Sequence, residues 1–305
     1  MIINIIQLNI SISISIYHNK SHGIFFNSSS FTIFNLIEGN INNNILHYFK
    51  WNHDIGILQI EPYLSSNLLF IRTKNRFFVW NIITEKNIYE QSIPYLCDIQ
   101  LSKKYLFACS NRKIYLIKMY NFQVLTTFEL KRDITENCCS ILWNPQTYKT
   151  SIAFSCYGSV GEITFWQGSQ MLTFSHQNDA IILIKQKQYH SKHLTFSLTK
   201  TNICIYKICD KSSTESEENI KLIHKINFDI GITALNSFST DKSLSQLFLC
   251  INDGKIIIIR IDDTKKSQKY KVIHINHCVS CVKKNSNILY ILRDGSIGTL
   301  KNNVL

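Results

Sequence analysis

A pattern of strand signals that recurs about every 44 residues is the feature that most constrains the fold of this 305-residue chain. Each unit contains two strands, a short polar turn, a third strand ending in an aromatic residue or Ile, and a fourth strand. The landmarks of the third strands are Phe34, Trp80, Leu116, Phe165, Ile205, Ile258 and Gly298. Their gaps of 46, 36, 49, 40, 53 and 40 residues are close to the roughly 40–45 residues of a four-stranded propeller blade.

The individual segments carry strand signals from one end of the chain to the other. Residues 10–16 (ISISISI) alternate strictly between apolar and small polar side chains, as a half-buried strand does. Residues 31–34, 76–80, 113–117, 162–166, 202–206 and 255–259 are short and rich in β-branched or aromatic residues. No stretch keeps an apolar period of 3.6 residues with helix caps. The sequence therefore predicts an all-β chain.

Seven units predict a seven-bladed β-propeller, which fits better than a sandwich because a sandwich rarely needs so many strands. The last unit has only three strand segments, at residues 278–281, 288–292 and 296–300. The opening residues 2–7 could supply its fourth strand and close the ring, which removes exposed sheet edges. Without an interdomain linker, residues 1–305 are expected to form a single domain.

One compositional break interrupts the pattern, at residues 210–219 (DKSSTESEEN). The segment is acidic, rich in Ser and without apolar residues, so it predicts a mobile surface loop. Its four hydroxyl residues next to Glu are possible phosphorylation sites, but a solvated loop is the favoured interpretation.

The net charge of +12 would ordinarily indicate an anionic partner. With 50 Ile and 27 Lys against 6 Arg and 4 Ala, however, much of that charge is typical of an AT-rich genome. The basic pairs lie in different units, with no arginine-rich stripe, so no nucleic-acid partner is expected. Neither a signal peptide nor a membrane-spanning segment is expected. The ten scattered cysteines are therefore interpreted as reduced, and the protein as cytoplasmic.

Four phrases of the chain resemble the PROPPINs, seven-bladed propellers that bind phosphoinositides on endomembranes and act in autophagy. They are residues 67–82, 101–129, 175–181 and 293–297, which are similar in order to the family's second, third, fifth and closing blades. The resemblance implies a non-catalytic scaffold, peripheral on autophagosome precursors, endosomes or the vacuole. It also implies partner proteins of autophagy-type complexes and membranes with phosphatidylinositol 3-phosphate or the 3,5-bisphosphate.

The family's F-R-R-G motif is absent from its expected place at residues 226–229 (INFD). Asn227 and Phe228 stand where the two arginines should be, and neither can form the bidentate phosphate contact of a guanidinium. In blade six, Ile251, Lys255 and Ile257 replace the family's Ser, Thr and His. The loop at residues 262–269 (DDTKKSQK) has no aromatic side chain to enter a bilayer. Direct lipid binding is therefore expected to be weakened or lost.

The blade-five pocket keeps more of the family's pattern. His176 matches the pocket His of the family, Ser197 or Thr199 could replace its Ser, and Lys200 and Lys225 could supply charge. The favoured structural interpretation of His176 is a hydrogen-bonded residue at a blade junction. These five residues are the candidate lipid-binding set.

Signals for other chemistry are weak. Cys278 and Cys281 form a lone C-x-x-C, and on a regular strand their thiols would point to opposite faces, so no metal site is expected. No catalytic motif or cofactor-binding loop occurs, and we expect neither an enzyme nor a cofactor. The alternative to a PROPPIN-like scaffold is a generic WD40-type adaptor in an unrelated complex, and protein partners cannot be inferred from a propeller alone.

Overall fold

The computed structural model of the protein describes most of the chain. The described residues are 11–17, 20–35, 39–40, 45–53, 55–63, 66–102, 105–130, 132–144, 149–156, 161–167, 170–175, 179–189, 192–208, 220–241, 243–251, 254–261, 270–284, 287–294 and 296–301. Within them the chain forms 28 strands and no helix, so the expected all-β class is confirmed. The described part also contains no helix long and apolar enough to cross a membrane.

The strands form seven four-stranded antiparallel sheets, divided between two compact units. Unit 1 comprises Met1–Pro94, Thr233–Ile261 and Lys269–Leu305, and holds four sheets. Its strands are β1 (Ser11–Tyr17), β2 (Lys20–Asn27), β3 (Ser30–Asn35) and β5 (Ile45–Lys50); β6 (Gln59–Tyr63), β7 (Leu68–Arg72), β8 (Arg76–Asn81) and β9 (Lys86–Ser92); β22 (Leu235–Thr240), β23 (Gln246–Ile251), β24 (Lys255–Arg260) and β25 (Tyr270–His274); and β26 (Cys278–Lys284), β27 (Asn287–Leu292), β28 (Ser296–Lys301) and β4 (Gly39–Asn40).

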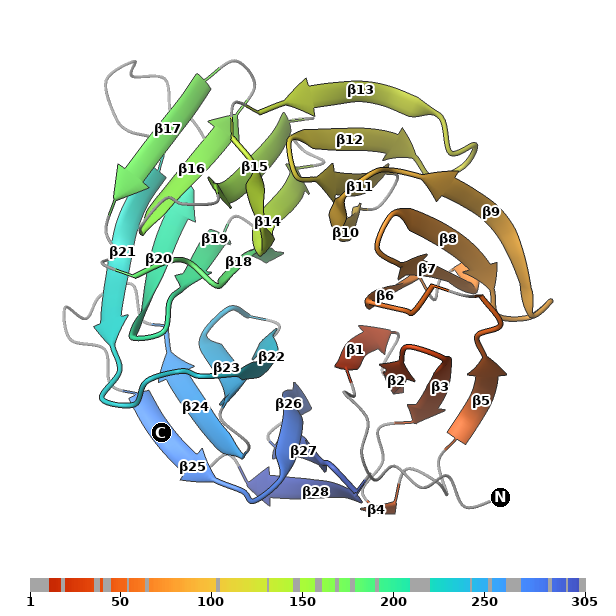
Figure 1. Cartoon of the computed structure of the whole chain (residues 1–305). Coiled ribbons are helices and arrows are strands. Elements are labelled where there is room, and N and C mark those ends of the chain that lie inside the picture. Colours follow the sequence, from red (N-terminus) through yellow and green to blue (C-terminus); the bar gives the residue numbers. More distant parts are fainter. Residues whose placement is uncertain are drawn as a thin grey trace. The chain divides into compact units, whose positions relative to one another are not determined.

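Unit 2 comprises Tyr95–Ile232 and Asp262–Gln268, and holds three sheets. Its strands are β10 (Leu96–Ser102), β11 (Tyr105–Ser110), β12 (Lys113–Lys118) and β13 (Val124–Glu129); β14 (Ile134–Asn144), β15 (Lys149–Cys156), β16 (Glu162–Gln167) and β17 (Gln170–Ser175); and β18 (Leu183–Tyr189), β19 (Lys192–Leu198), β20 (Asn202–Ile208) and β21 (Ile220–Asn227). Five of the sheets are meanders of consecutive strands (Figure 1); the sheet of β1, β2, β3 and β5 skips β4, which completes the sheet of β26–β28.

Every landmark of the sequence repeat lies on the third strand of its sheet, from Phe34 on β3 to Gly298 on β28. The middle strands β23 and β24 are apolar on both faces, with the residues between their ends buried. In β24, the four isoleucines 256–259 are all fully buried, and Lys255 and Arg260 stand at the two ends. The sequence therefore predicted the repeat and its phase correctly.

The sheet of β26, β27 and β28 is completed by a strand from the first part of the chain. Gly39 and Asn40 of β4 pair with Ile297 and Ser296 of β28, and Figure 1 shows β4 beside β28. The segment expected to supply this strand, residues 2–7, lies outside the described residues, as does the predicted loop at 210–219. The fourth strand that the structure describes here is thus only two residues long.

Hydroxyl groups on first strands connect neighbouring sheets within each unit. In unit 2, the backbone N–H of Gln186 on β18 donates to Ser140 Oγ on β14 at 2.7 Å. In unit 1, Ser239 Oγ on β22 donates to the Cys281 carbonyl on β26 at 2.9 Å. Because these groups are removed from water, each bond satisfies a polar atom that would otherwise destabilise the fold.

Candidate functional site

The β19–β20 turn lies at the centre of the region where the sequence places a lipid pocket. Thr199 Oγ1 accepts hydrogen bonds from the backbone N–H groups of Thr201 at 3.3 Å and Asn202 at 3.1 Å. The Thr199 N–H in turn donates to the Asn202 carbonyl at 2.9 Å. Thr199 is fully buried, so its hydroxyl is committed to holding the turn.

The segment that follows β21 covers this turn. The Phe228 N–H donates to the Thr201 carbonyl, and the Ile232 N–H donates to the Lys200 carbonyl, both at 2.7 Å. The Phe228 side chain is only 7% exposed. The residue expected at the place of the second arginine of the family motif is therefore a ring buried inside the fold.

Asn227, the residue expected at the place of the other arginine, is the last residue of β21. It pairs with Asn202 in the register of β20 and β21, and its side chain is exposed. A neutral amide there can form hydrogen bonds but carries no charge to balance a phosphate.

The charges around the turn are mixed. Lys200 is exposed in the turn itself, and Lys225 is exposed on β21, opposite Cys204. Against them, Asp179 accepts a hydrogen bond from Thr201 Oγ1 at 2.5 Å, and Asp229 follows Phe228 directly. Two lysines and two carboxylates near one turn give little net attraction for an anion.

Of the remaining candidates, Ser197 lies on β19, opposite Ile184 and Cys204, and is fully buried. His176 lies outside the described residues. The structure thus places Thr199, Lys200, Asn227 and Phe228 around one turn, with Ser197 inside the sheet behind it. Their role in lipid binding stays a prediction.

Two of the three blade-six positions are buried apolar residues in the structure. Ile251 at the end of β23 and Ile257 in β24 are both fully buried. Lys255 pairs with Ile251 in the register and is half-buried. Isoleucine side chains offer no hydrogen-bond donor for a phosphate. The loop at residues 262–269 lies outside the described residues.

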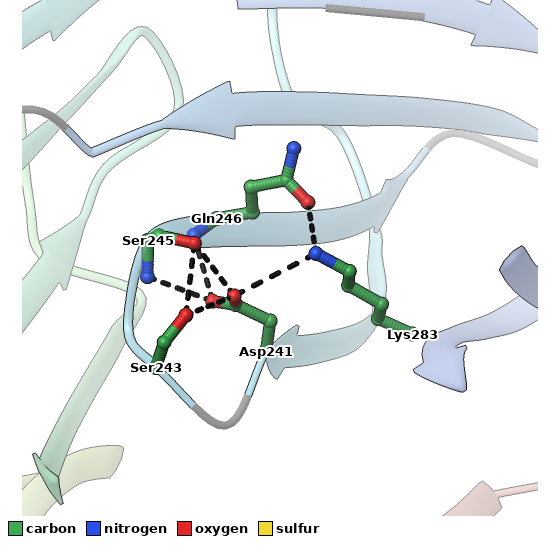
Figure 2. Close-up of polar contacts among 5 residues, drawn as sticks. All are labelled: Asp241, Ser243, Ser245, Gln246 and Lys283. Carbon is green, nitrogen blue, oxygen red and sulfur yellow. Dashed lines mark hydrogen bonds and ion pairs between the residues drawn. The ribbon is translucent and has the colours of Figure 1, made fainter. Parts of the chain in front are cut away.

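A polar cluster between β22, β23 and β26 was not found by sequence analysis (Figure 2). Asp241 is 7% exposed and accepts hydrogen bonds from the hydroxyls of Ser243 and Ser245, each at 2.6 Å. The N–H groups of Ser245 and Gln246 donate to its other oxygen at 2.8 and 2.7 Å. Lys283 Nζ lies 3.7 Å from the carboxylate and 2.8 Å from Gln246 Oε1.

The Asp241 cluster is saturated with protein donors, so its chemistry is structural. It fixes the β22–β23 turn and ties it to β26 of the next sheet through Lys283. The sequence does carry a signal for the turn itself, because an Asp followed by Ser at the second and fourth positions (DKSLS) favours side-chain-to-backbone bonds. The distant lysine, 42 residues later, has no such local signal.

The two cysteines of the C-x-x-C do not follow the alternation expected for a regular strand. The register between β26 and β27 shifts between Cys278 and Ser280, and such a bulge moves the following side chains relative to the sheet. Cys278 and Cys281 consequently lie in one buried cluster. In the described part of the chain, no three His, Cys, Asp or Glu side chains come together as a metal site would require.

Comparison with known proteins places this geometry within a class of folds. No protein-family model matches the sequence, and no curated protein matches it either. Among solved structures, Hsv2 of Kluyveromyces marxianus matches with a TM-score of 0.68 and 12% identity, over 97% of this chain and 93% of that one. KlAtg21, solved in a complex with the coiled-coil of AgAtg16, matches with a TM-score of 0.73 and 14% identity, over 96% and 94%.

The chain therefore has the fold of a seven-bladed β-propeller, as the sequence repeat predicted. Hsv2 and Atg21 are PROPPIN structures, so the PROPPIN resemblance stated from sequence phrases is confirmed at the level of the fold. Kluyveromyces lactis Hsv2 is similar to the chain to the same degree, with a TM-score of 0.65 and 10% identity, over 97% of this chain and 98% of that one.

Proposed function

We propose that the protein is a non-catalytic propeller scaffold of the PROPPIN type whose direct binding to phosphatidylinositol 3-phosphate is weakened or lost. It acts in the cytoplasm, peripherally on endomembranes of the autophagic or endolysosomal system. Propeller likeness over nearly the whole chain supports the scaffold role. The single observation that carries the lipid part is the burial of Phe228 at the place of a phosphate-binding arginine.

The surroundings of Phe228 support the same conclusion. An arginine pair gives two charge-assisted, often bidentate contacts to phosphate, each roughly twice as strong as a neutral hydrogen bond. Here the pair is an exposed amide and a buried ring, beside lysines whose charges are offset by Asp179 and Asp229. The remaining attraction to membranes is the general one of a chain with net charge +12, which salt screens.

A protein partner is the second part of the proposal. The solved complex of KlAtg21 with the coiled-coil of AgAtg16 supports a coiled-coil protein as the class of partner. The test is a calorimetric titration of the purified chain with a coiled-coil peptide of an Atg16 protein. Saturable binding supports this part, and the absence of heat at concentrations where KlAtg21 binds contradicts it.

The lipid part is tested by vesicle co-sedimentation. Wild-type protein is mixed with vesicles containing phosphatidylinositol 3-phosphate, or with phosphatidylserine vesicles of equal surface charge, at physiological salt. We expect equal or absent pelleting with both. A preference for the phosphoinositide in the wild type would overturn the lipid part, and repeating the assay with vesicles that carry the 3,5-bisphosphate covers the second lipid of the family.

A restored arginine provides the positive comparison. Asn227→Arg returns one guanidinium to an exposed position that needs no repacking, so its pelleting with phosphoinositide vesicles should rise several-fold over that with phosphatidylserine. Asn276→Arg adds the same charge at another exposed position and should raise binding to both vesicles equally. Equal behaviour of the two variants would show that residue 227 no longer faces any headgroup site.

A further inference from the structure

Two pairs of buried thiols occupy corresponding places in the two units. Cys250 is the fifth residue of β23, and its Sγ lies 3.6 Å from Sγ of Cys278, the first residue of β26. Cys109 is the fifth residue of β11, and its Sγ lies 3.5 Å from Sγ of Cys139 on β14. In each pair, the second strand of one sheet faces the first strand of the next. All four side chains are buried.

The pair formed by Cys250 and Cys278 is electrostatically asymmetric. The Cys250 thiol is oriented to donate to Cys278 Sγ, and this hydrogen bond lowers the pKa of Cys278. The same bond, followed by burial, raises the pKa of Cys250. The pKa of Cys278 therefore lies below that of Cys250, which makes Cys278 the member of the pair that more readily forms the thiolate, the reactive form of cysteine.

The corresponding pair in unit 2 has the same arrangement, with Cys109 in the place of Cys250. The hydrogen bond with Cys139 and burial both raise the pKa of Cys109 well above its ordinary value. The two pairs thus share a geometry, and in both the thiol on the second strand is the one whose pKa is raised.

We propose that Cys250 and Cys278 are a peroxide-sensitive pair that forms a reversible disulfide. The bond would link the sheet of β22–β25 covalently to the sheet of β26–β28 and β4. The sulfur atoms must approach from 3.6 Å to about 2.05 Å, the length of an S–S bond. Side-chain rotation about the Cα–Cβ bonds of two residues on packed strands is the movement required.

The chemistry balances with hydrogen peroxide as the oxidant. The Cys278 thiolate attacks one peroxide oxygen, the O–O bond breaks, and the departing hydroxide takes a proton to become water. The resulting sulfenic acid is attacked by the sulfur of Cys250, its S–O bond breaks, and the second water leaves with the Cys250 proton. Two thiols and one peroxide become one disulfide and two waters, and an added dithiol reverses the step.

Because both sulfur atoms are buried, a small oxidant reaches them more readily than a large one. Hydrogen peroxide is small and uncharged, so it can enter a packed core during local opening far more readily than glutathione or an alkylating reagent. The third thiol nearby, Cys281, is also buried, and burial raises its pKa. It is therefore a poorer nucleophile than Cys278 and a poorer competitor for the first oxidation step.

The test is peptide mapping of the folded wild-type chain after a timed exposure to hydrogen peroxide. The reaction is stopped with catalase, the protein is unfolded in an alkylating reagent, and the digest is analysed without reduction. We expect a peptide linked through Cys250 and Cys278 to form, and its rate of formation is compared with that of a peptide linked through Cys109 and Cys139. Dithiothreitol should abolish the link.

Three results would overturn the proposal: no peptide linked through Cys250 and Cys278, linkage of Cys278 to Cys281, or conversion of Cys278 to sulfinic acid without any link. Cys250→Ser should remove the linked peptide, whereas Cys204→Ser, a change at a buried cysteine outside the two pairs, should leave it intact. The mapping of wild-type protein does not depend on the folding of either variant.

Thermal unfolding provides an independent measurement on the wild type. The link would close a loop between residues 28 apart in sequence, which restricts the unfolded chain. Oxidised protein should therefore melt several degrees above the reduced protein, and the difference should vanish on reduction. An equal or lower melting temperature of the linked form would show that the bond does not fit the native arrangement.

Discussion

At the scale of single residues, buried titratable groups determine how the protein responds to pH. Asp241 is held by Ser243, Ser245, Gln246 and Lys283 (Figure 2). Burial acts to raise the pKa of its carboxyl, but the hydrogen bonds from the two serines and the backbone outweigh that effect and leave the pKa below the ordinary 3.8. The charged form therefore stabilises the native state.

Asp241→Asn should lower the free energy of unfolding by roughly 2–4 kcal/mol at pH 7, because it removes the charge and turns an acceptor into a donor facing donors. Because the native pKa is depressed, this contribution is present above pH 3.8 and lost as the pH falls through the native value. The measurement is urea unfolding of both proteins at pH 7 and pH 3. Asp294→Asn, at an exposed turn, is the control, and a gap between wild type and Asp241→Asn that stays constant with pH would contradict the assignment.

His193 on β19 titrates in a different window. Burial lowers its pKa from 6.5 to about 4, and within the described residues its Nε2 has no hydrogen-bond partner. The native state therefore holds the neutral ring, while the unfolded chain binds a proton below pH 6.5. Stability is full above pH 6.5 and falls between 6.5 and 4, by up to about 3 kcal/mol.

His193→Leu should remove that loss and flatten the stability profile between pH 7 and pH 4.5. The check is the free energy of unfolding by guanidinium at several pH values in this window. His274→Leu, at an exposed position on β25, should keep the wild-type slope. If both variants retained the slope, another group would be responsible for it.

At the scale of elements, the β23–β24 turn depends on the backbone of one glycine. Gly254 has a φ of +119°, and a Cβ there would overlap the carbonyl oxygen of Ile275. The Gly254 carbonyl accepts the Ile275 N–H at 2.8 Å, so β24 and the segment after β25 are held together at this point. Only glycine combines that backbone conformation with that close approach.

Gly254→Ala should therefore lower the free energy of unfolding by roughly 2–4 kcal/mol, through backbone strain and displacement of Ile275. Gly231→Ala is the matched control, because a Cβ there would meet nothing within 4 Å, and its effect should stay within about 1 kcal/mol. Both are measured by urea unfolding. Equal effects of the two substitutions would show that Gly254 is not strained against Ile275.

The elements were also what the sequence predicted best. Strands such as residues 76–80 and 255–259 appear in the structure within a residue of their expected ends, because β-branched runs bounded by polar turns leave few alternatives. β4 was missed, since a two-residue strand, Gly39–Asn40, carries no periodicity. The bulge at Cys278 was missed for a related reason: alternation cannot show where a register shifts.

At the scale of the whole molecule, the repeat was visible in the sequence and the candidate site only in part. Repeat spacing reports on local segments, whereas a site depends on contacts between distant ones. Two features of the site depend on such distant contacts: Phe228 is buried against the turn at Thr201, and Lys283 lies beside Asp241. The absence of arginines at residues 227 and 228 can be read from the sequence because it concerns residue identity, whereas the burial of Phe228 could not.

The contact between the first sheet and the sheet of β26–β28 and β4 gives a prediction at the scale of the whole molecule. Phe34 of β3 is fully buried and packs with Val282, Leu289, Ile291 and Ile297 of the last sheet. In a repeat fold each sheet is stabilised by its neighbours. The side chain of Phe34 therefore connects the first sheet to the last within unit 1.

Phe34→Ala should cost roughly 3–5 kcal/mol of unfolding free energy through the cavity it leaves. The loss should be largest for β26–β28, which hydrogen exchange followed by mass spectrometry can measure strand by strand. Tyr120→Ala removes an aromatic side chain that is 78% exposed and should change neither stability nor exchange. If β28 exchanged no faster in Phe34→Ala than in the wild type, the prediction would be wrong. The last sheet would then be stabilised by its own strands rather than by contact with Phe34.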